Sequence, residues 1–231
     1  MKRNTLEALL RAREAKQAIA LLTNLNDGTQ HLFGPSDSDS SIREELAQTA
    51  RQVLQSDRSA TVSTVDGEVF VQAFNPPLRL VIVGAVHIAQ ALAPMAMVAG
   101  YEVSVIDPRL SFATAERFPG VELHTSWPDE VLQSMQLDTR TAVVTLTHDP
   151  KIDDPALHVA LGSAAFYIGC LGSKRTHAGR LERLREAGYD DDALARIYGP
   201  LGLALGARSP AEIALSALAQ LTARLRGSSL A

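Results

Sequence analysis

The sequence predicts an α/β protein, in which a parallel sheet with helices on both faces follows a small α+β domain. From residue 78 onward, short apolar runs alternate with helical segments, and such alternation implies parallel strands joined by right-handed crossovers. The run Leu-Val-Ile-Val at 80–83 has no polar alternation, which is typical of a strand that helices cover on both faces. Asn75, Pro76 and Pro77 interrupt regular structure. We therefore expect domains at 1–76 and 77–231.

The composition is that of an ordinary globular protein. The 231 residues are 46% hydrophobic, and 22 basic against 26 acidic side chains give a net charge of −4 without a dense basic cluster. This balance argues against nucleic acid as a partner. Residues 1–14 are charged throughout, and no apolar run reaches the roughly 18 residues that span a bilayer, so we expect a cytoplasmic protein without a membrane span.

The amino-terminal part is predicted to contain a helix, a hairpin, a second helix and a second hairpin. The expected elements are a helix with Leu6, Leu9 and Leu10 on one face, strands at 18–25 and 29–33 around Asn26-Asp27-Gly28, a helix at 42–54 opened by a Ser41/Glu44 capping box, and a hairpin at 61–73 about Asp66-Gly67. The polar, turn-rich stretch 34–40 is expected to be a flexible loop.

The carboxy-terminal part is expected to contain five parallel strands, at 78–83, 102–106, 122–124, 142–146 and 165–168. Helix starts are expected after Ser126, after Ser173 and at the Ser209/Glu212 capping box, and Gly188 is expected to end the helix that Ser173 opens. The glycine-rich run 199–207 is apolar, so we expect it to serve close packing.

The first chemical motif follows the first parallel strand. Gly84 and Ala89 fit the first and third positions of a glycine-rich loop that aims backbone amides at a pyrophosphate, whereas Val86 occupies the middle position, where glycine normally lets the phosphates approach. Asp107 lies 18 residues beyond Ala89, where a carboxylate accepts hydrogen bonds from ribose hydroxyls, and Arg109 favours a 2′-phosphate instead. The pattern predicts a Rossmann-like nucleotide-binding fold.

A second motif, Thr147-His148-Asp149, lies beyond the carboxyl end of a predicted strand, the edge at which open parallel sheets bind ligands. These side chains can donate to a phosphate or accept a proton. A metal site that adds Asp153 or His158 is the alternative, but their spacing fixes no coordination geometry, so a hydrogen-bonded turn is preferred.

The third motif, at 169–175, again joins a strand, a glycine-bearing loop and a helix start. Free backbone amides, the helix dipole, the Ser173 hydroxyl and the cations Lys174 and Arg175 are expected to converge on an anion, with Gly169 and Gly172 in the loop. The single cysteine, Cys170, has apolar neighbours and is interpreted as a buried small hydrophobe. The common hydrolase motifs are absent from the sequence, so we assign no catalytic residue and no metal ligand.

Taken in order, the stretches 80–92, 147–149, 169–175 and 200–214 resemble the motifs of XdhC/CoxI-type xanthine dehydrogenase accessory proteins. The family's Gly-Ala-Gly-His stretch is matched by Gly84, Ala85 and His87, and Val86 departs from it. The resemblance covers roughly residues 76–226. It implies a Rossmann-like XdhC carboxy-terminal domain in a cytoplasmic factor that handles molybdenum cofactor (molybdopterin) as a chaperone rather than as an enzyme.

The same resemblance implies partners: an apo molybdenum hydroxylase of the xanthine or carbon monoxide dehydrogenase type, cofactor-maturation proteins, and a second copy in a homodimer. Full-length relatives have an amino-terminal domain with Ser-Xaa-Pro-Arg and Gly-Gly-Cys segments, and residues 1–76 contain neither. The chain therefore resembles a shortened member, and a thiolate for molybdenum or sulfur handling would come from a partner.

Two other functions stay open at this point. One is an NAD(P)-dependent oxidoreductase, in which Gly84 and Asp107 hold the nucleotide cofactor and His148 acts as acid or base. The other is a ligand-free scaffold for cofactor insertion. The residues expected to bind a cofactor are Gly84, Ala85, His87, Asp107, Thr147, His148, Asp149, Gly169, Gly172, Ser173, Lys174 and Arg175.

Overall fold

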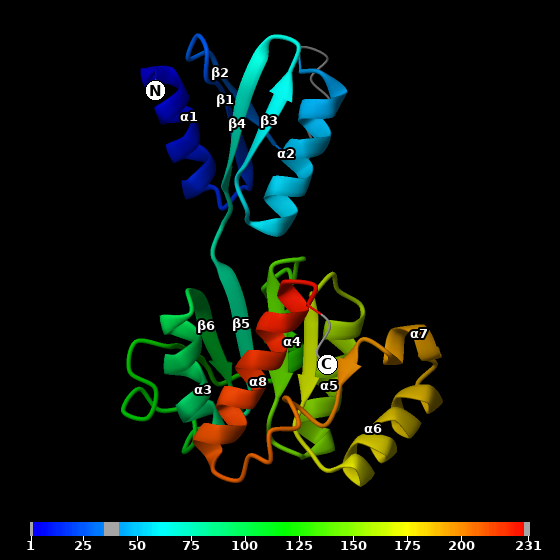
Figure 1. Cartoon of the computed structure of the whole chain (residues 1–231). Helices are drawn as coiled ribbons and strands as arrows, with labels where there is room; N and C mark the ends of the chain where they lie inside the picture. Colours follow the sequence, from blue (N-terminus) through cyan, green and yellow to red (C-terminus); the bar gives the residue numbers. More distant parts are fainter. Residues whose placement is uncertain (1, 35–41, 229–231) are drawn as a thin grey trace. The chain divides into compact units, whose positions relative to one another are not determined.

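The computed structural model describes residues 2–34 and 42–228. The chain divides into two compact units, Met1–Pro76 and Pro77–Ala231 (Figure 1). The division falls between Pro76 and Pro77, where proline removes the amide donors that a continuing sheet would use. Among the described residues, none of the helices is both long and apolar enough to cross a membrane.

The amino-terminal unit is a small α+β structure. Its antiparallel sheet has the strand order β2-β1-β4-β3. The bounds are α1 Arg3–Glu14, β1 Ile19–Asn24, β2 Gln30–Phe33, α2 Glu44–Ser56, β3 Ala60–Thr64 and β4 Gly67–Phe74. Both predicted hairpins are confirmed, because β1 pairs with β2 and β3 pairs with β4. One sheet face packs against α2 around Ala20, Leu22, Phe33, Ala50 and Val71.

Two details of this unit differ from the sequence prediction. Helix α2 begins at Glu44 rather than 42, and its N-cap is Arg43, whose side chain has no acceptor. The predicted cap Ser41 and residues 35–40 of the predicted loop lie outside the described residues. In α1 the buried positions are Leu9 and Ala12, whereas Leu6 and Leu10 are exposed, so the apolar face is narrower than predicted.

The carboxy-terminal unit contains the parallel sheet, with strand order β10-β9-β8-β5-β6-β7. The strands are β5 Leu78–Val83, β6 Tyr101–Ile106, β7 Glu122–His124, β8 Thr141–Thr145, β9 Tyr167–Cys170 and β10 Ile197–Tyr198. The chain runs outward from β5 to β7 and then returns beside β5 with β8. The order therefore reverses between β5 and β8, which makes this pair the topological switch point.

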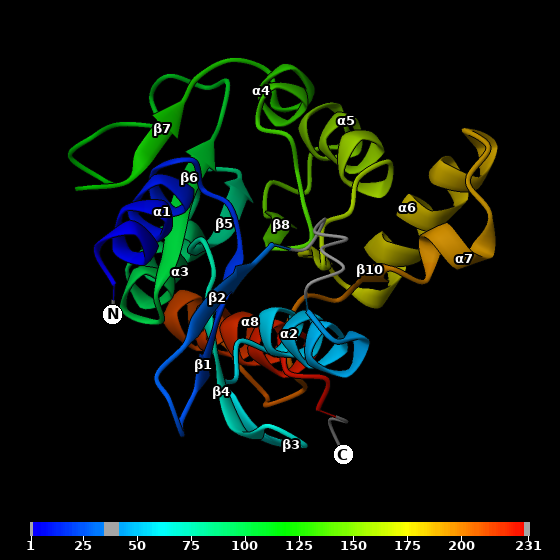
Figure 2. The ribbon, with the colours of Figure 1, turned by 90° about the horizontal axis from the view of Figure 1, so that it is seen from above.

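Helices cover both faces of this sheet (Figures 1 and 2). Helices α3 His87–Val98 and α8 Pro210–Leu225 pack on one face around Leu80, Ile82 and Leu92. The other face is covered by α4 Pro128–Ser134, α5 Pro150–Leu161, α6 Lys174–Glu186 and α7 Asp191–Leu194. The predicted α/β fold class is confirmed, with β5 buried between the two helical layers.

The helix caps of this unit are partly as predicted. Ser173 caps α6 by accepting from the Thr176 amide, and Ser209 and Glu212 form the reciprocal capping box of α8. The prediction of Ser126 as a cap was wrong: the N-cap of α4 is Trp127, and Pro128 opens the helix. Strand β9 starts at Tyr167 rather than 165, because Tyr167 is the residue that pairs with Ala142 of β8.

Candidate functional site

The loops after β5 and β8 meet at the switch point. Gly84 follows β5 with φ of +109°, a backbone conformation that favours glycine. A Cβ atom at Gly84 would lie 2.6 Å from Thr147 Cγ2 and 3.3 Å from the Thr147 amide nitrogen. The first two predicted motifs are therefore in direct contact, and Gly84 is the residue that permits it.

Helix α3 begins beside this contact. Its N-cap is Val86, whose hydrocarbon side chain cannot accept a hydrogen bond and packs, half-buried, against the core. The first amides of α3 consequently depend on an acceptor from solvent or from a ligand, which is the usual condition of a phosphate-binding helix start. His87 is the exposed first residue of the helix. The side chain of Val86 thus lies toward the core, although it occupies the position where the motif has glycine.

Asp107 is fully buried at the end of β6. Its Oδ2 accepts from the Ala85 amide at 2.8 Å and from Arg109 Nη2 at 2.7 Å, and its Oδ1 accepts from Arg109 Nε at 2.8 Å. Burial opposes the charged form, but the hydrogen bonds from Arg109 and Ala85 outweigh it and lower the pKa of Asp107. Both oxygens already hold donors, so a ribose hydroxyl would have to displace Arg109 or share the carboxylate with it.

Arg109 is held in place from a second side. Its guanidinium carbon lies 4.2 Å from the centroid of the Phe112 ring, within the range of a cation–π contact. Its pKa is raised, chiefly by the hydrogen bond to Asp107, with further contributions from Asp149 and Asp153. Arg109 therefore lies near enough to the loop after β8 to add positive potential at the switch point.

The motif Thr147-His148-Asp149 is organised by a buried carboxylate. Asp149 is the N-cap of α5 and accepts from the Lys151 amide at 3.0 Å. Asp153, one turn into α5, accepts from Thr147 Oγ1 at 2.6 Å and from the His148 amide at 3.1 Å. These bonds hold His148 at φ of +62°, with its side chain exposed. The hydrogen-bonded turn that the sequence favoured is what the structure contains.

The metal alternative finds no support in this geometry. Asp153 serves as a hydrogen-bond acceptor, and His158 contacts Tyr189, with 3.1 Å between His158 Nδ1 and the Tyr189 hydroxyl. Within residues 2–34 and 42–228, no group of three or more His, Cys, Asp or Glu side chains is placed to hold a metal ion.

The two glycines of the third motif have different roles, one in packing and one in the loop. Gly169 lies inside β9, where a Cβ would lie 2.6 Å from Leu201 Cδ1 and 2.7 Å from Tyr167 Cε1, so its smallness serves packing. Gly172 lies in the loop with φ of +146°, and a Cβ there would lie 3.7 Å from His148 Nδ1. The loop after β9 thus lies against the loop after β8. Lys174 and Arg175 are exposed on the first turn of α6.

Cys170 is the last residue of β9. It is fully buried, and burial raises the pKa of its thiol to about 11. A thiol in this condition is protonated and inert at neutral pH. The interpretation of Cys170 as a small hydrophobe is confirmed.

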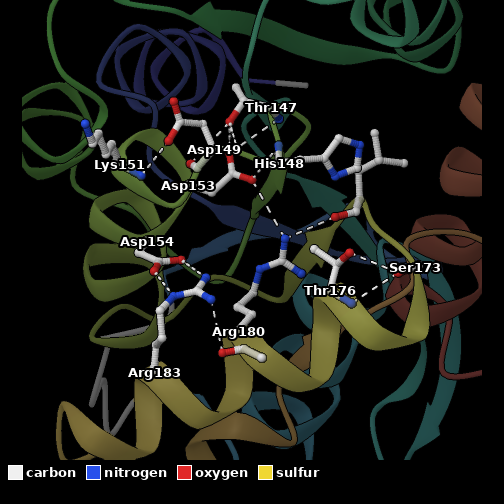
Figure 3. A network of polar contacts seen from close by, with 12 residues as sticks. Thr147, His148, Asp149, Lys151, Asp153, Asp154, Ser173, Thr176, Arg180 and Arg183 are labelled. Atoms are coloured by element: carbon white, nitrogen blue, oxygen red, sulfur yellow. Dashed lines mark hydrogen bonds and ion pairs between the residues drawn. The ribbon is translucent and has the colours of Figure 1, made fainter.

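Arg180 was missed by sequence reasoning. It lies on α6, is 2% exposed, and its Nη2 is 3.8 Å from Asp153 Oδ2 (Figure 3). Its sequence context, a helix rich in Arg and Glu, predicts a solvent-facing cation, so no local signal marks it.

Of the predicted residues, the structure brings together Gly84 with Thr147, Ala85 with Asp107, and His148 with Gly172.

A sheet of this strand order, with a glycine turn and a helix start at the switch point, defines a Rossmann-type domain. Residues 80–221 match the family described as the XdhC Rossmann domain. The chain belongs to this family, and the resemblance inferred from its motifs is confirmed.

Named relatives agree with this assignment. The chain is 36% identical over 151 residues to the molybdenum cofactor insertion chaperone PaoD of Escherichia coli, a match that covers 65% of this chain and 41% of PaoD. It is 33% identical over 153 residues to a probable xanthine dehydrogenase subunit of Bacillus subtilis, a match that covers 66% of this chain and 44% of that protein. The chain thus spans less than half the length of either relative.

A solved structure shares the fold over nearly the whole chain. It is described as a xanthine dehydrogenase from Bacillus halodurans and superposes with a TM-score of 0.70, at 24% identity, over 98% of this chain and 65% of that one. At this identity the likeness concerns the fold of both units. It extends the match beyond residues 80–221 to the amino-terminal α+β unit.

Proposed function

We propose that this chain holds the phosphate-bearing end of a molybdenum cofactor, in pterin or nucleotide form, and delivers it to an apo molybdenum hydroxylase. The observation that carries the proposal is the meeting of three ligand loops at one edge of the sheet: Gly84 contacts Thr147, and Gly172 approaches His148. Helices α3, α5 and α6 begin from these loops, so their positive ends lie at the same edge. An anionic group is the chemistry that such an edge favours.

The chemistry of the donors fits the phosphate end of this cargo. The α3 start has no side-chain acceptor on Val86, and two cations, Lys174 and Arg175, open α6. The metal end has no thiolate available, because Cys170 is buried and its thiol is protonated. A partner supplies any sulfur ligand in this scheme, and the chain contributes recognition rather than turnover. The name of PaoD, a molybdenum cofactor insertion chaperone, supports a role in handling this cofactor.

The proposal is tested by identifying what the protein carries. The full chain is expressed in a host that makes molybdenum cofactor, purified gently and denatured, and the released small molecules are identified by mass spectrometry. We expect a molybdopterin species in the wild type, and roughly tenfold less in a Lys174→Ala, Arg175→Ala double variant, because two charge-assisted contacts are lost. A Lys2→Ala, Arg3→Ala variant removes the same charge from exposed positions of the amino-terminal unit and should retain the ligand.

Other outcomes have definite meanings. A nicotinamide dinucleotide in place of a pterin would favour the oxidoreductase alternative. If wild-type protein releases neither, and added molybdenum cofactor does not bind, the proposal is wrong and the scaffold alternative gains support.

A further inference from the structure

Two loops of the candidate site are each hydrogen-bonded to one member of a buried ion pair. Asp153, on α5, accepts from Thr147 Oγ1 at 2.6 Å and from the His148 amide at 3.1 Å. Arg180, on α6, donates through Nη2 to the Leu171 carbonyl oxygen at 3.1 Å. Arg180 Nη2 lies 3.8 Å from Asp153 Oδ2, and both side chains are 2% exposed. The pair therefore connects the loop after β8 to the loop after β9, as Figure 3 shows.

The arrangement of this ion pair does not favour stability. Within the described residues, Nε and Nη1 of Arg180 are buried without a hydrogen-bond partner, which costs free energy. Burial raises the pKa of Asp153 although Thr147 and Arg180 oppose the shift, so the ionised carboxyl group is less favourable in the folded protein than in the unfolded chain. Replacing such a pair with neutral side chains is often harmless to stability. What the pair contributes is then the position that each partner gives to its loop.

The two connected loops lie against each other. A Cβ atom at Gly172 would lie 3.7 Å from His148 Nδ1, and Gly172 directly follows Leu171, the residue that Arg180 holds. Helix α5 begins from one loop and helix α6 from the other. A shift of either loop would therefore change both the spacing of the loops and the placement of the two helix starts.

We infer that Asp153 and Arg180 are positioning residues of the candidate site, and that their pairing couples the loop after β8 to the loop after β9. The inference rests on the proposed function for the identity of the cargo, and it adds what holds two of the three ligand loops at a fixed spacing. Both side chains are buried, so neither touches the cargo in this scheme. Coupling through a hydrogen-bonded pair means that a change at either member loosens both loops.

A second ion pair between the same two helices provides a matched control. Arg183 donates to the two carboxylate oxygens of Asp154 at 2.6 and 3.0 Å, and it also donates to the Gly179 carbonyl oxygen. All three residues lie within α5 or α6, outside the two loops. Removal of this pair therefore perturbs the contact between the helices without removing a hydrogen bond to either loop.

The inference is tested by amide hydrogen exchange, followed residue by residue by NMR on the ligand-free full chain. Arg180→Met should speed exchange at Thr147 and His148 by at least about threefold, a size within the range of coupled neighbours, although Arg180 donates to Leu171. Asp153→Asn should likewise speed exchange at Leu171, although Asp153 accepts from Thr147 and His148. Amides of β5 serve as the internal reference, because a general loss of stability would speed their exchange as well.

A double variant separates positioning from stability. Arg180→Met leaves Asp153 as a buried, unpaired carboxylate, whereas Arg180→Met, Asp153→Asn removes both charges and should be more stable than Arg180→Met in denaturant unfolding followed by the fluorescence of Trp127. The double variant should still exchange faster than wild type at both loops, and it should carry less molybdopterin. A purely structural pair predicts the reverse, with loop exchange that recovers as stability recovers.

The matched Arg183→Met, Asp154→Asn variant should leave exchange at both loops, and the amount of recovered molybdopterin, as in wild type. The inference is overturned if each single variant affects only the loop to which its own residue is hydrogen-bonded. It is also overturned if the loop amides speed up no more than those of β5, or if the control variant loosens the loops equally.

These outcomes are distinct from those of the proposed function. The exchange measurements use ligand-free protein, so coupled loops support the inference even where no molybdopterin is recovered from wild type, and in that case the proposed cargo is what fails. Loops that respond separately overturn the inference even where molybdopterin co-purifies with the protein.

Discussion

Replacing Gly84 with alanine is expected to destabilise the carboxy-terminal unit by about 2–6 kcal/mol and to disrupt the candidate site. Two costs add at this position. A side chain at φ of +109° is strained, by about 1–3 kcal/mol, and the new Cβ overlaps Thr147, which adds about 1–3 kcal/mol of overpacking. The overlap between the new Cβ and Thr147 is relieved only if the loops after β5 and β8 move apart. Denaturant unfolding followed by Trp127 fluorescence measures the loss.

Gly100→Ala is the matched control for this prediction. Gly100 also has positive φ, at +89°, but nothing lies within 4 Å of the position of a Cβ. Its substitution should cost only the backbone strain, about 1–2 kcal/mol. Thr147→Ser, which removes the Cγ2 atom, should recover part of the stability lost in Gly84→Ala. Equal losses in the two alanine variants would show that the contact between Gly84 and Thr147 is not tight.

Asp107→Asn is expected to produce the second large effect, a loss of about 2–4 kcal/mol at neutral pH. The carboxylate is fully buried and accepts hydrogen bonds from the Ala85 backbone amide and the Arg109 guanidinium. In asparagine an NH2 donor replaces one of the two acceptor oxygens, so a donor faces the donors of Ala85 and Arg109. The expected loss is smaller than for a fully buried pair because Arg109 is 36% exposed and solvent relieves its charge. Asp192→Asn, at an exposed position, should change stability by less than about 0.5 kcal/mol.

The pH dependence of this loss has a definite sign. The pKa of Asp107 is lower in the folded protein than the ordinary value of 3.8, so the unfolded chain binds the proton more readily. The stabilisation is fully present above pH 3.8 and is lost as pH falls through the folded pKa. The stability gap between wild type and Asp107→Asn should therefore stay constant near neutral pH and narrow as the pH falls below 3.8. A gap that stays constant as the pH falls well below 3.8 would contradict an ionised, paired Asp107.

Much of the fold could be predicted because its signals are local. Strands β5 and β7 have the bounds that the pattern predicted, and Ser173 and Ser209 cap helices as their hydroxyls suggest. The two-residue strand β10 gives no periodic pattern and was not predicted. The start of β9 could not be placed either, since residues 164–166 are as apolar as the strand, and pairing with β8 decides where it begins.

The loops of the candidate site could be predicted from the sequence, but the buried residues behind them could not. Glycine turns and helix starts are visible in the sequence, so Gly84, Thr147 and Gly172 could be assigned to one sheet edge. Asp153 and Arg180 pair across two helices and lie 27 positions apart in the sequence. Both residue types are normally solvent-exposed in helices, and only tertiary packing reveals that these two are buried.

The central claim, that the cargo is held at the carboxyl edge of the parallel sheet, is tested most directly by amide hydrogen exchange. Protein purified with bound molybdopterin is compared with protein from which the cofactor has been removed. We predict slower exchange in the loaded protein at residues 84–89, 147–151 and 172–176, with no change in the strands of the amino-terminal unit. Protection confined to the amino-terminal unit, or equal exchange in both samples, would contradict the account.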